Sequence, residues 1–316
     1  MAPSLSANAR GGSRLLPILA VEIGLLGAFA TPGNTAASSP SPGPPAASLT
    51  VRVAVRPAGP GDVVVMNAVS SEPLEEARVD VFDHVTPMWS AGNPSRWTAL
   101  IGVDVETPPG RYPVTVRGLS TGGEPTVSKA FLTVTSKIFG TRRLLVDPRF
   151  SQPPASERPR IQREARRVGV IFSGASGARY WDPPFEAPVA APTSSPFGVR
   201  SVFNGELRGR HNGVDFASSS GAPVHAPAGG RVALVEALYF TGNTVIIDHG
   251  QGLYSLMAHL ERAVVADGAL LARGDVIGFV GATGRATGPH LHWSVRLQGA
   301  RVDPLSLLSR TRALAH

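Results

Sequence analysis

Short runs of β-branched and other apolar residues, separated by turns, recur from residue 49 almost to the end of the chain. Runs of this length bounded by Gly and Pro are typical of strands. They predict a mainly β protein, and several such strands in fewer than 90 residues predict a small antiparallel β-sandwich over residues 49–135. The expected strands there are residues 49–55, 62–66, 77–82, 112–117 and 130–134. His84 and Trp89 fall between these strands and are interpreted as packing or surface residues.

A second β-rich part follows at residues 187–308, with strands expected at 244–248, 275–280 and 288–295, and a short tail at 309–316. The connector between the two parts, residues 136–186, is basic. Nine of its residues between Lys137 and Arg167 are Lys or Arg and three are acidic. Such a segment suits either an anionic partner or a solvated connector, and nucleic acid is not expected because no aromatic stacking surface accompanies it. A helix is expected from Ser156, as N-cap, to Val168.

The first 30 residues carry the features of a secretory signal peptide. Arg10 and Arg14 precede a short apolar run that ends in small residues at Ala30. This order predicts export with cleavage near Ala30. The run is short for a membrane span, so an uncleaved membrane anchor is the alternative. Residues 31–48 are uncharged and rich in Pro, Ser, Ala and Gly, which predicts a disordered linker.

The chain contains no cysteine, so any metal must be held through nitrogen and oxygen. Seven of its eight histidines lie beyond residue 200, which is where a metal site is expected. His290 and His292 stand two apart in a predicted strand, so both imidazoles lie on one face of it. In the segment before His259, alternation places Leu256 and Ala258 on the core side and His259 on the polar side. That strand is expected to present His259 to the same cleft.

His211 and Asp215 form the third element of this pattern. In an extended strand their Cα atoms would be roughly 13 Å apart, too far for one ion, so the segment is expected to bend at Gly213. One His and one carboxylate from here, with one His of the His-x-His pair, make a three-ligand set that leaves a fourth position for water. That is the arrangement of a catalytic zinc site. His225 and His249 are interpreted as surface or turn residues.

Rival motifs are missing from the sequence. It has no His-Glu-x-x-His zinc helix and no Gly-x-Ser-x-Gly elbow, and its glycine-rich stretch before His290 does not fit a dinucleotide or phosphate loop.

The order of these motifs resembles the lysostaphin-type (LytM-like) zinc metalloendopeptidases, which cut peptide bonds of bacterial peptidoglycan. The resemblance covers roughly residues 197–308 and includes His211 to Asp215, Gly221-Ala222-Pro223-Val224, Gly242-Asn243-Thr244-Val245, Tyr254 to Leu260 and Gly281 to His292. It implies a lysostaphin-like antiparallel β-sheet peptidase domain, and residues 49–135 are similar to the sandwich domain of some Gram-negative members. Met257 stands where many relatives carry Tyr.

By this resemblance one zinc ion would be bound by His211, Asp215 and His292, with His259 and His290 as the catalytic residues beside it. An exported enzyme of the periplasm or cell envelope is implied, with peptidoglycan as substrate and cell-envelope proteins as partners of the sandwich. Two alternatives come from other classes. One is a non-catalytic activator of cell-wall amidases, which is the role of relatives that have lost their metal ligands. The other is a carrier or binding domain of the phosphocarrier type, which shares the Pro-Val-x-Ala-Pro turn. The filled ligand set disfavours both.

Overall fold

The computed structural model describes residues 48–53, 57–145, 152–174 and 176–315. The predicted signal peptide and all but residue 48 of the predicted linker lie outside the described residues. Within the described residues, no helix combines the length and the apolar character needed to cross a bilayer.

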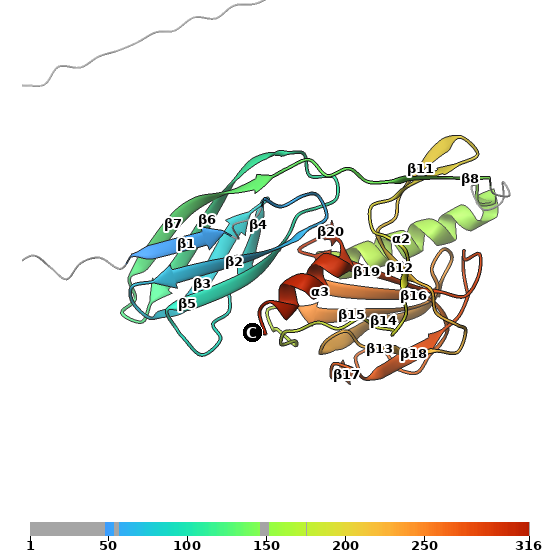
Figure 1. The fold of residues 1–316 in the computed structure, drawn as a ribbon. Helices are drawn as coiled ribbons and strands as arrows, with labels where there is room; N and C mark the ends of the chain where they lie inside the picture. Colours follow the sequence, from blue (N-terminus) through green and yellow to red (C-terminus); the bar gives the residue numbers. More distant parts are fainter. Residues whose placement is uncertain (1–47, 54–56, 146–151, 175, 316) are drawn as a thin grey trace, which may run out of the picture. The chain divides into compact units, whose positions relative to one another are not determined.

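Two antiparallel sheets form the first part of the chain (Figure 1). They face each other across a shared core that contains Met66, Val79, Ile101, Val116 and Leu132, so this part is a β-sandwich, as predicted. One sheet has the order β1 (Leu49–Val53), β2 (Val63–Ser70), β5 (Arg96–Gly102), and the other has β4 (His84–Pro87), β3 (Leu74–Val81), β6 (Gly110–Ser120), β7 (Pro125–Val134).

The sequence prediction missed β4 and β5. His84 therefore lies within a strand and not between strands, as had been expected. β4 is only four residues long, and β5 begins with Arg96 and Trp97 after a turn, so neither shows a long alternating pattern. Trp89, by contrast, lies outside the named strands and makes an isolated bridge with Thr98.

The connector contains β8 (Thr141–Leu144), a 3-10 turn η1 (Ala155–Glu157) and α2 (Arg158–Ser173). The predicted N-cap was wrong, because Ser156 lies in the 3-10 turn and Glu157 takes the cap position without a side-chain bond to the helix. The helix also runs five residues further than Val168. Its apolar side, formed by Val168, Ile171 and Phe172, packs against a sheet, and this contact explains the longer helix.

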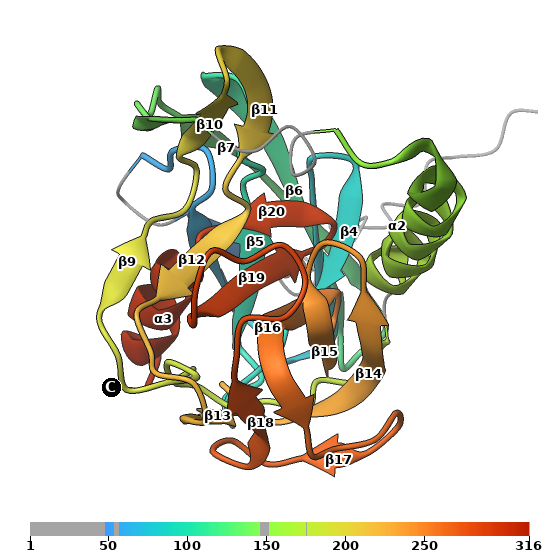
Figure 2. The same ribbon diagram turned by 90° about the vertical axis from the view of Figure 1, so that its right-hand side faces the viewer.

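That sheet has ten strands and forms the main body of the C-terminal part. Figure 2 shows β19 between β12 and β16, and α2 beside β14. Along the main path the strand order is β17 (Leu270–Leu271), β14 (Gly230–Leu238), β15 (Gly242–Gly250), β16 (Leu253–Ala263), β19 (Leu291–Leu297), β12 (Gly213–Phe216), β9 (Thr193–Ser195). Three strands lie off this path. β13 (Pro223–His225) pairs with β18 (Val276–Val280), β18 also pairs with β16, and β20 (Ala300–Val302) pairs with β19.

Two smaller elements complete this part. β10 (Arg200–Phe203) and β11 (Glu206–Arg210) form a hairpin, and β8 of the connector pairs with β10 in parallel. Helix α3 (Pro304–Arg312) starts at Asp303, whose side chain accepts a hydrogen bond from the Leu305 amide at 2.9 Å. The predicted mainly β, antiparallel fold class is confirmed, with the β8–β10 pair as a parallel exception.

The two faces of the ten-stranded sheet are different. One face carries the large core, in which Trp293, Met257 and Val214 are fully buried. The other face carries a small cluster that includes Leu234, Ile246, Leu256 and Ala258, and α2 covers this cluster. Antiparallel partners point to the same side, and Ala258 pairs with His292, so the candidate metal site lies on the face that α2 partly covers.

Candidate metal and catalytic site

The structure brings together the three residues that the sequence predicted as metal ligands. Asp215 of β12 lies directly opposite His292 of β19, so their side chains share one face. His211 precedes β12 and turns its ring onto them. The His211 Nε2 atom is 2.9 Å from Asp215 Oδ1 and 3.1 Å from His292 Nδ1, and the latter two atoms are 2.8 Å apart.

The strand conformation is interrupted at residues 211–212, between β11 and β12, whereas Gly213, where the bend was expected, belongs to β12. Gly213 is the first residue of β12 and its φ is not positive. It is needed for space, because a Cβ there would lie 2.3 Å from the Trp293 carbonyl oxygen and 2.8 Å from the His292 ring. The glycine lets β12 approach β19 closely enough for the three donors to meet.

The proton on His211 is fixed by its surroundings. Its Nδ1 is 2.9 Å from the Pro196 carbonyl oxygen, which can only accept, so Nδ1 carries the hydrogen. A neutral His211 therefore turns a lone pair on Nε2 towards a carboxylate oxygen. Two acceptors at 2.9 Å repel unless a cation or a proton lies between them. The donor arrangement is thus suited to a bound cation.

The donor set fits zinc. Ligand bonds of about 2.0–2.1 Å in a tetrahedral site hold the donors about 3.3 Å apart. The three donor atoms here are separated by 2.8 to 3.1 Å, and two nitrogens with one carboxylate oxygen form a common zinc shell with one position open.

The charges at the site also favour a cation. Burial opposes ionisation of Asp215, but its close side-chain contacts with His211 and His292 outweigh burial and hold the pKa of that carboxyl well below its usual range. Burial also lowers the pKa of His292, which keeps its imidazole neutral and available as a ligand.

His259 reaches the site by a different route from the one predicted. Ala258 faces the site, and Met257 lies in the core on the opposite side of the sheet. Simple alternation would therefore turn His259 into that core. Its backbone instead adopts a left-handed conformation, with φ of 62°, next to an irregularity in the pairing of β16. This bulge turns the ring back to the site, with its centroid 4.7 Å from that of His290.

His259 and His290 are held in the same way. Nδ1 of His259 donates to the Thr283 carbonyl and Nδ1 of His290 donates to the Gly288 carbonyl, both at 2.9 Å. Each neutral ring therefore has its lone pair on Nε2. The His290 Nε2 atom is 4.0 Å from Asp215 Oδ1. Burial, aided by the neighbouring histidines, lowers the pKa of His259 to about 4.

The carbonyls of Pro196, Thr283 and Gly288 were missed by sequence reasoning, since a carbonyl carries no residue-specific signal. His249 was misassigned. It is completely buried and is not a surface residue. Its two ring nitrogens are satisfied there by hydrogen bonds to the Gly229 carbonyl and to the Ser255 hydroxyl. His225, the other histidine interpreted as surface or turn, is half-buried at the end of β13.

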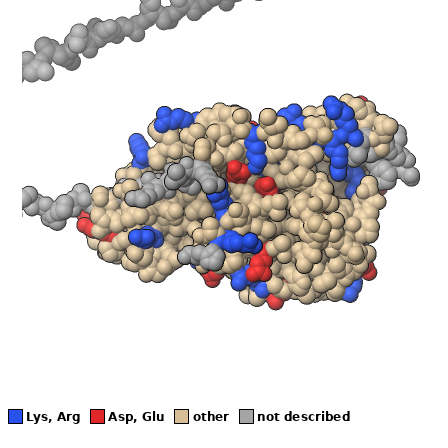
Figure 3. All heavy atoms as spheres, viewed as in Figure 1, with Lys and Arg blue, Asp and Glu red and all other residues tan. Residues whose placement is uncertain are grey.

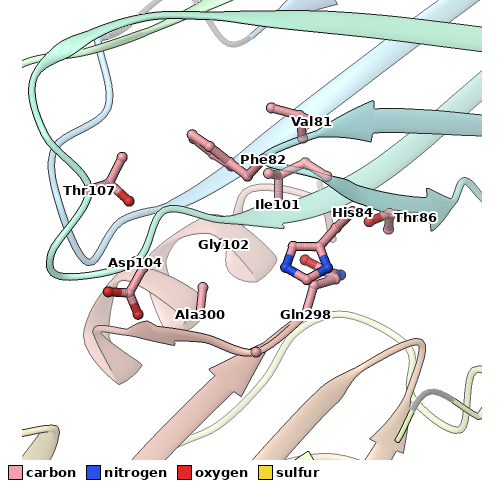
Figure 4. A pocket seen from close by; sticks show the side chains of 11 residues that line it. Val81, Phe82, His84, Thr86, Ile101, Gly102, Asp104, Thr107, Gln298 and Ala300 are labelled. Atoms are coloured by element: carbon pink, nitrogen blue, oxygen red, sulfur yellow. The ribbon is translucent and has the colours of Figure 1, made fainter. Parts of the chain in front are cut away.

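A separate pocket of about 270 Å³ lies away from these five residues. Figure 4 shows His84, Thr86, Asp104 and Gln298 around it, together with apolar side chains such as Ile101. Thr86 Oγ1 is buried there without a hydrogen-bond partner. None of the predicted site residues lines this pocket.

Comparison with known proteins shows several similarities. Residues 209–304 match the model of peptidase family M23. A crystal structure described as a putative peptidase M23 from Pseudomonas aeruginosa is 33% identical, with a TM-score of 0.62, over 80% of this chain and 95% of that one.

Curated relatives match over shorter stretches. A DD-carboxypeptidase/endopeptidase of Neisseria meningitidis is 42% identical over 38% of this chain and 28% of its own length. The peptidoglycan DD-endopeptidase ShyB of Vibrio cholerae is 41% identical over 30% and 22%. The murein hydrolase activator EnvC of Escherichia coli is 34% identical over 47% and 37%. The chain thus covers between a fifth and two fifths of these proteins.

Proposed function

Because the chain belongs to peptidase family M23, we propose that it is a zinc-dependent endopeptidase that hydrolyses peptide bonds of bacterial peptidoglycan. The observation that carries the proposal is the convergence of the donor atoms of His211, Asp215 and His292 beside two further imidazoles. These three residues would hold the ion. His259 and His290 would act on the water and the substrate.

When bound, zinc would acidify a water molecule and polarise the scissile carbonyl. The chain's own residues would handle the protons. His259 and His290 are both fixed through Nδ1, so Nε2 of either ring can take a proton from the attacking water and return it to the leaving amine. The other ring, when it is protonated at Nε2, can donate to the oxygen on which charge develops. The hydrogen bonds to Thr283 and Gly288 hold both rings in the orientation that these steps need.

The substrate assignment follows the family and the names of the relatives. The Neisseria relative is named a DD-carboxypeptidase/endopeptidase, and ShyB is named a peptidoglycan DD-endopeptidase. A peptidoglycan substrate requires export to the periplasm or cell envelope, which agrees with the signal peptide expected at residues 1–30. We also propose the division into a sandwich at residues 49–135, a connector at 136–186 and a peptidase domain at 187–308, with the sandwich available to envelope proteins.

The activator of murein hydrolases is the second candidate, because one relative carries that name. An activator needs neither metal ligands nor proton carriers. Here three donors, two oriented histidines and a glycine that makes room for them are all in place. That arrangement favours the endopeptidase.

The test is digestion of purified, cross-linked peptidoglycan by wild type and by His292→Ala, with metal analysis of both proteins. Wild type is expected to contain one zinc and to release cross-link fragments, and the variant is expected to do neither. Stoichiometric zinc with unchanged peptidoglycan would favour the activator. Wild type without zinc, in zinc-containing buffer, would contradict the metal site itself.

A further inference from the structure

Arg296 lies on the same face of β19 as the metal-site residue His292. Buried residues Trp293, Val295 and Leu297 point to the core, while His292, Ser294 and Arg296 alternate with them on the other side. Arg296 pairs with Tyr254 of β16, two rows along from the pair of His292 and Ala258. β19, β16 and α2 can be followed in Figure 2.

The spacing between Arg296 and His292 suits a peptide substrate. Four residues along a strand separate their Cα atoms by about 13 Å. An extended peptide covers the same distance with about four residues. A substrate cleaved beside His292 and lying along β19 would therefore bring a group a few residues from the scissile bond to the Arg296 side chain.

The guanidinium of Arg296 has no hydrogen bond or ion pair among the described residues. Its only close polar or aromatic contact there is with the Phe172 ring of α2, whose centroid is 5.4 Å from Cζ. Asp104 is the nearby carboxylate, but it is already bound to Arg301, with 2.6 Å between Oδ1 and Nη2 and further bonds from Nε and the backbone amide. Arg296 is thus left without a partner of opposite charge.

Partial burial without a partner of opposite charge is energetically unfavourable for a guanidinium cation. Arg296 is half-buried, and burial, with the charge of Arg301 added, lowers its pKa to about 10. By contrast, the α2 arginines nearest the sheet have partners, since Arg160 binds Glu164 and Arg167 binds Glu236. Figure 3 shows basic side chains over the region of α2 and the small β8–β10–β11 sheet. Among the described residues near the site, Arg296 is the cation whose position calls for an anionic ligand.

We propose that Arg296 is a specificity-determining residue that binds a carboxylate of the substrate peptide. A guanidinium can hold a carboxylate with two parallel hydrogen bonds, and the Phe172 ring would keep its plane in place. The cross-linked peptides of peptidoglycan carry free carboxylates, so the ligand class agrees with the proposed function, on which this inference rests. Arg296 would align the peptide along β19 and take no part in proton transfer.

The test compares two substrates and three variants of the full, zinc-loaded chain. One substrate is a cross-linked peptidoglycan fragment with free carboxylates, and the other is the same fragment with these groups converted to carboxamides. The variants are Arg296→Ala, Arg296→Lys and, as control, Arg312→Ala, which removes the same charge from an exposed position on α3.

For the free-carboxylate fragment, Arg296→Ala is expected to raise KM about 10- to 100-fold with little change in kcat, since charged hydrogen bonds contribute to that extent. Arg296→Lys should raise KM less than Arg296→Ala does, because lysine keeps the positive charge but cannot form the two parallel hydrogen bonds of a guanidinium. The carboxamide fragment should be cut equally by wild type and Arg296→Ala, and Arg312→Ala should behave as wild type. An equal loss on both fragments, or no loss, would overturn the proposal.

Equilibrium binding of both fragments separates this proposal from the proposed hydrolysis. Wild type should bind the free-carboxylate fragment more tightly than the carboxamide, and Arg296→Ala should bind both equally weakly. That result would support Arg296 even if no fragment were cleaved, in which case the proposed activity alone would fail. Equal affinity of wild type for the two fragments, or no binding of either, would contradict the role of Arg296.

Discussion

At the scale of single residues, Gly213 and His259 determine whether the site can form. A side chain at Gly213 would collide with the Trp293 carbonyl and the His292 ring. His259 reaches the site only because its backbone adopts a left-handed conformation that a non-glycine residue seldom takes. The structure gathers the five residues that the sequence predicted for the site, but the predicted alternation before His259 was wrong, because Ala258 faces the site and Met257 lies in the core.

Gly213→Ala should weaken zinc binding, because His292 would have to move away from a Cβ placed 2.8 Å from its ring. We expect at least a tenfold rise in the zinc dissociation constant, measured by competition with a chelator. Gly177→Ala is the matched control, since a Cβ there meets nothing within 4 Å and its φ is not positive. Unchanged zinc affinity in Gly213→Ala would contradict the packing argument.

His249 should make stability depend on pH. The Trp293 indole donates to Ser255, the Ser255 hydroxyl donates to His249 Nε2, and His249 Nδ1 donates to the Gly229 carbonyl. This chain holds the ring neutral, and burial lowers its pKa to about 4. The unfolded state, with a pKa near 6.5, binds the proton first as pH falls. The stabilisation is therefore complete above about pH 6.5 and is lost between about pH 6.5 and 4.

From these values His249 should account for about 2 kcal/mol of the stability lost between pH 8 and pH 5. Denaturant unfolding of wild type and His249→Asn at both pH values measures it. The variant should be less stable at pH 8 but should lose about 2 kcal/mol less than wild type on acidification. Equal losses in the two proteins would show that His249 is not buried in the neutral form.

At the scale of elements, long alternating runs were predictable and short or irregular ones were not. β6 and β16 contain runs that the sequence had identified, whereas β4 and the bulge of β16 depend on partners distant in the chain. His249 shows the same limit, since nothing local marks Ser255 and Gly229 as its partners. The end of α2 is also set by tertiary contact, because Phe172 packs against Tyr254.

Tyr254→Phe tests how α2 is attached to the sheet. The Tyr254 hydroxyl donates a 2.8 Å hydrogen bond to the carbonyl of Gly174, the residue that ends α2. Its loss should lower the free energy of unfolding by about 1 kcal/mol. In the control Tyr180→Phe, the removed hydroxyl has no hydrogen bond among the described residues, so urea unfolding should show no comparable change. Equal effects of the two substitutions would exclude the helix contact as the cause.

At the scale of the whole molecule, zinc should stabilise the folded chain, because His211 and Asp215 meet His292 only after the sheet has formed. A ligand present at 100 times its dissociation constant contributes about 2.7 kcal/mol. Removing zinc with a chelator should therefore lower the Tm of wild type by several degrees, and of His290→Ala equally. His292→Ala should show no chelator-dependent shift. A shift of the same size in His292→Ala would place the ion elsewhere.

The central claim is metal-dependent hydrolysis of a peptidoglycan peptide bond, and digestion in water labelled with oxygen-18 tests it most directly. Zinc-loaded wild type should yield fragments with one new amine and one new carboxyl group that carries a single labelled oxygen. His290→Ala, with its zinc retained, should form these fragments about 100- to 10,000-fold more slowly. A wild-type protein with full zinc content that releases no labelled fragment would contradict the account.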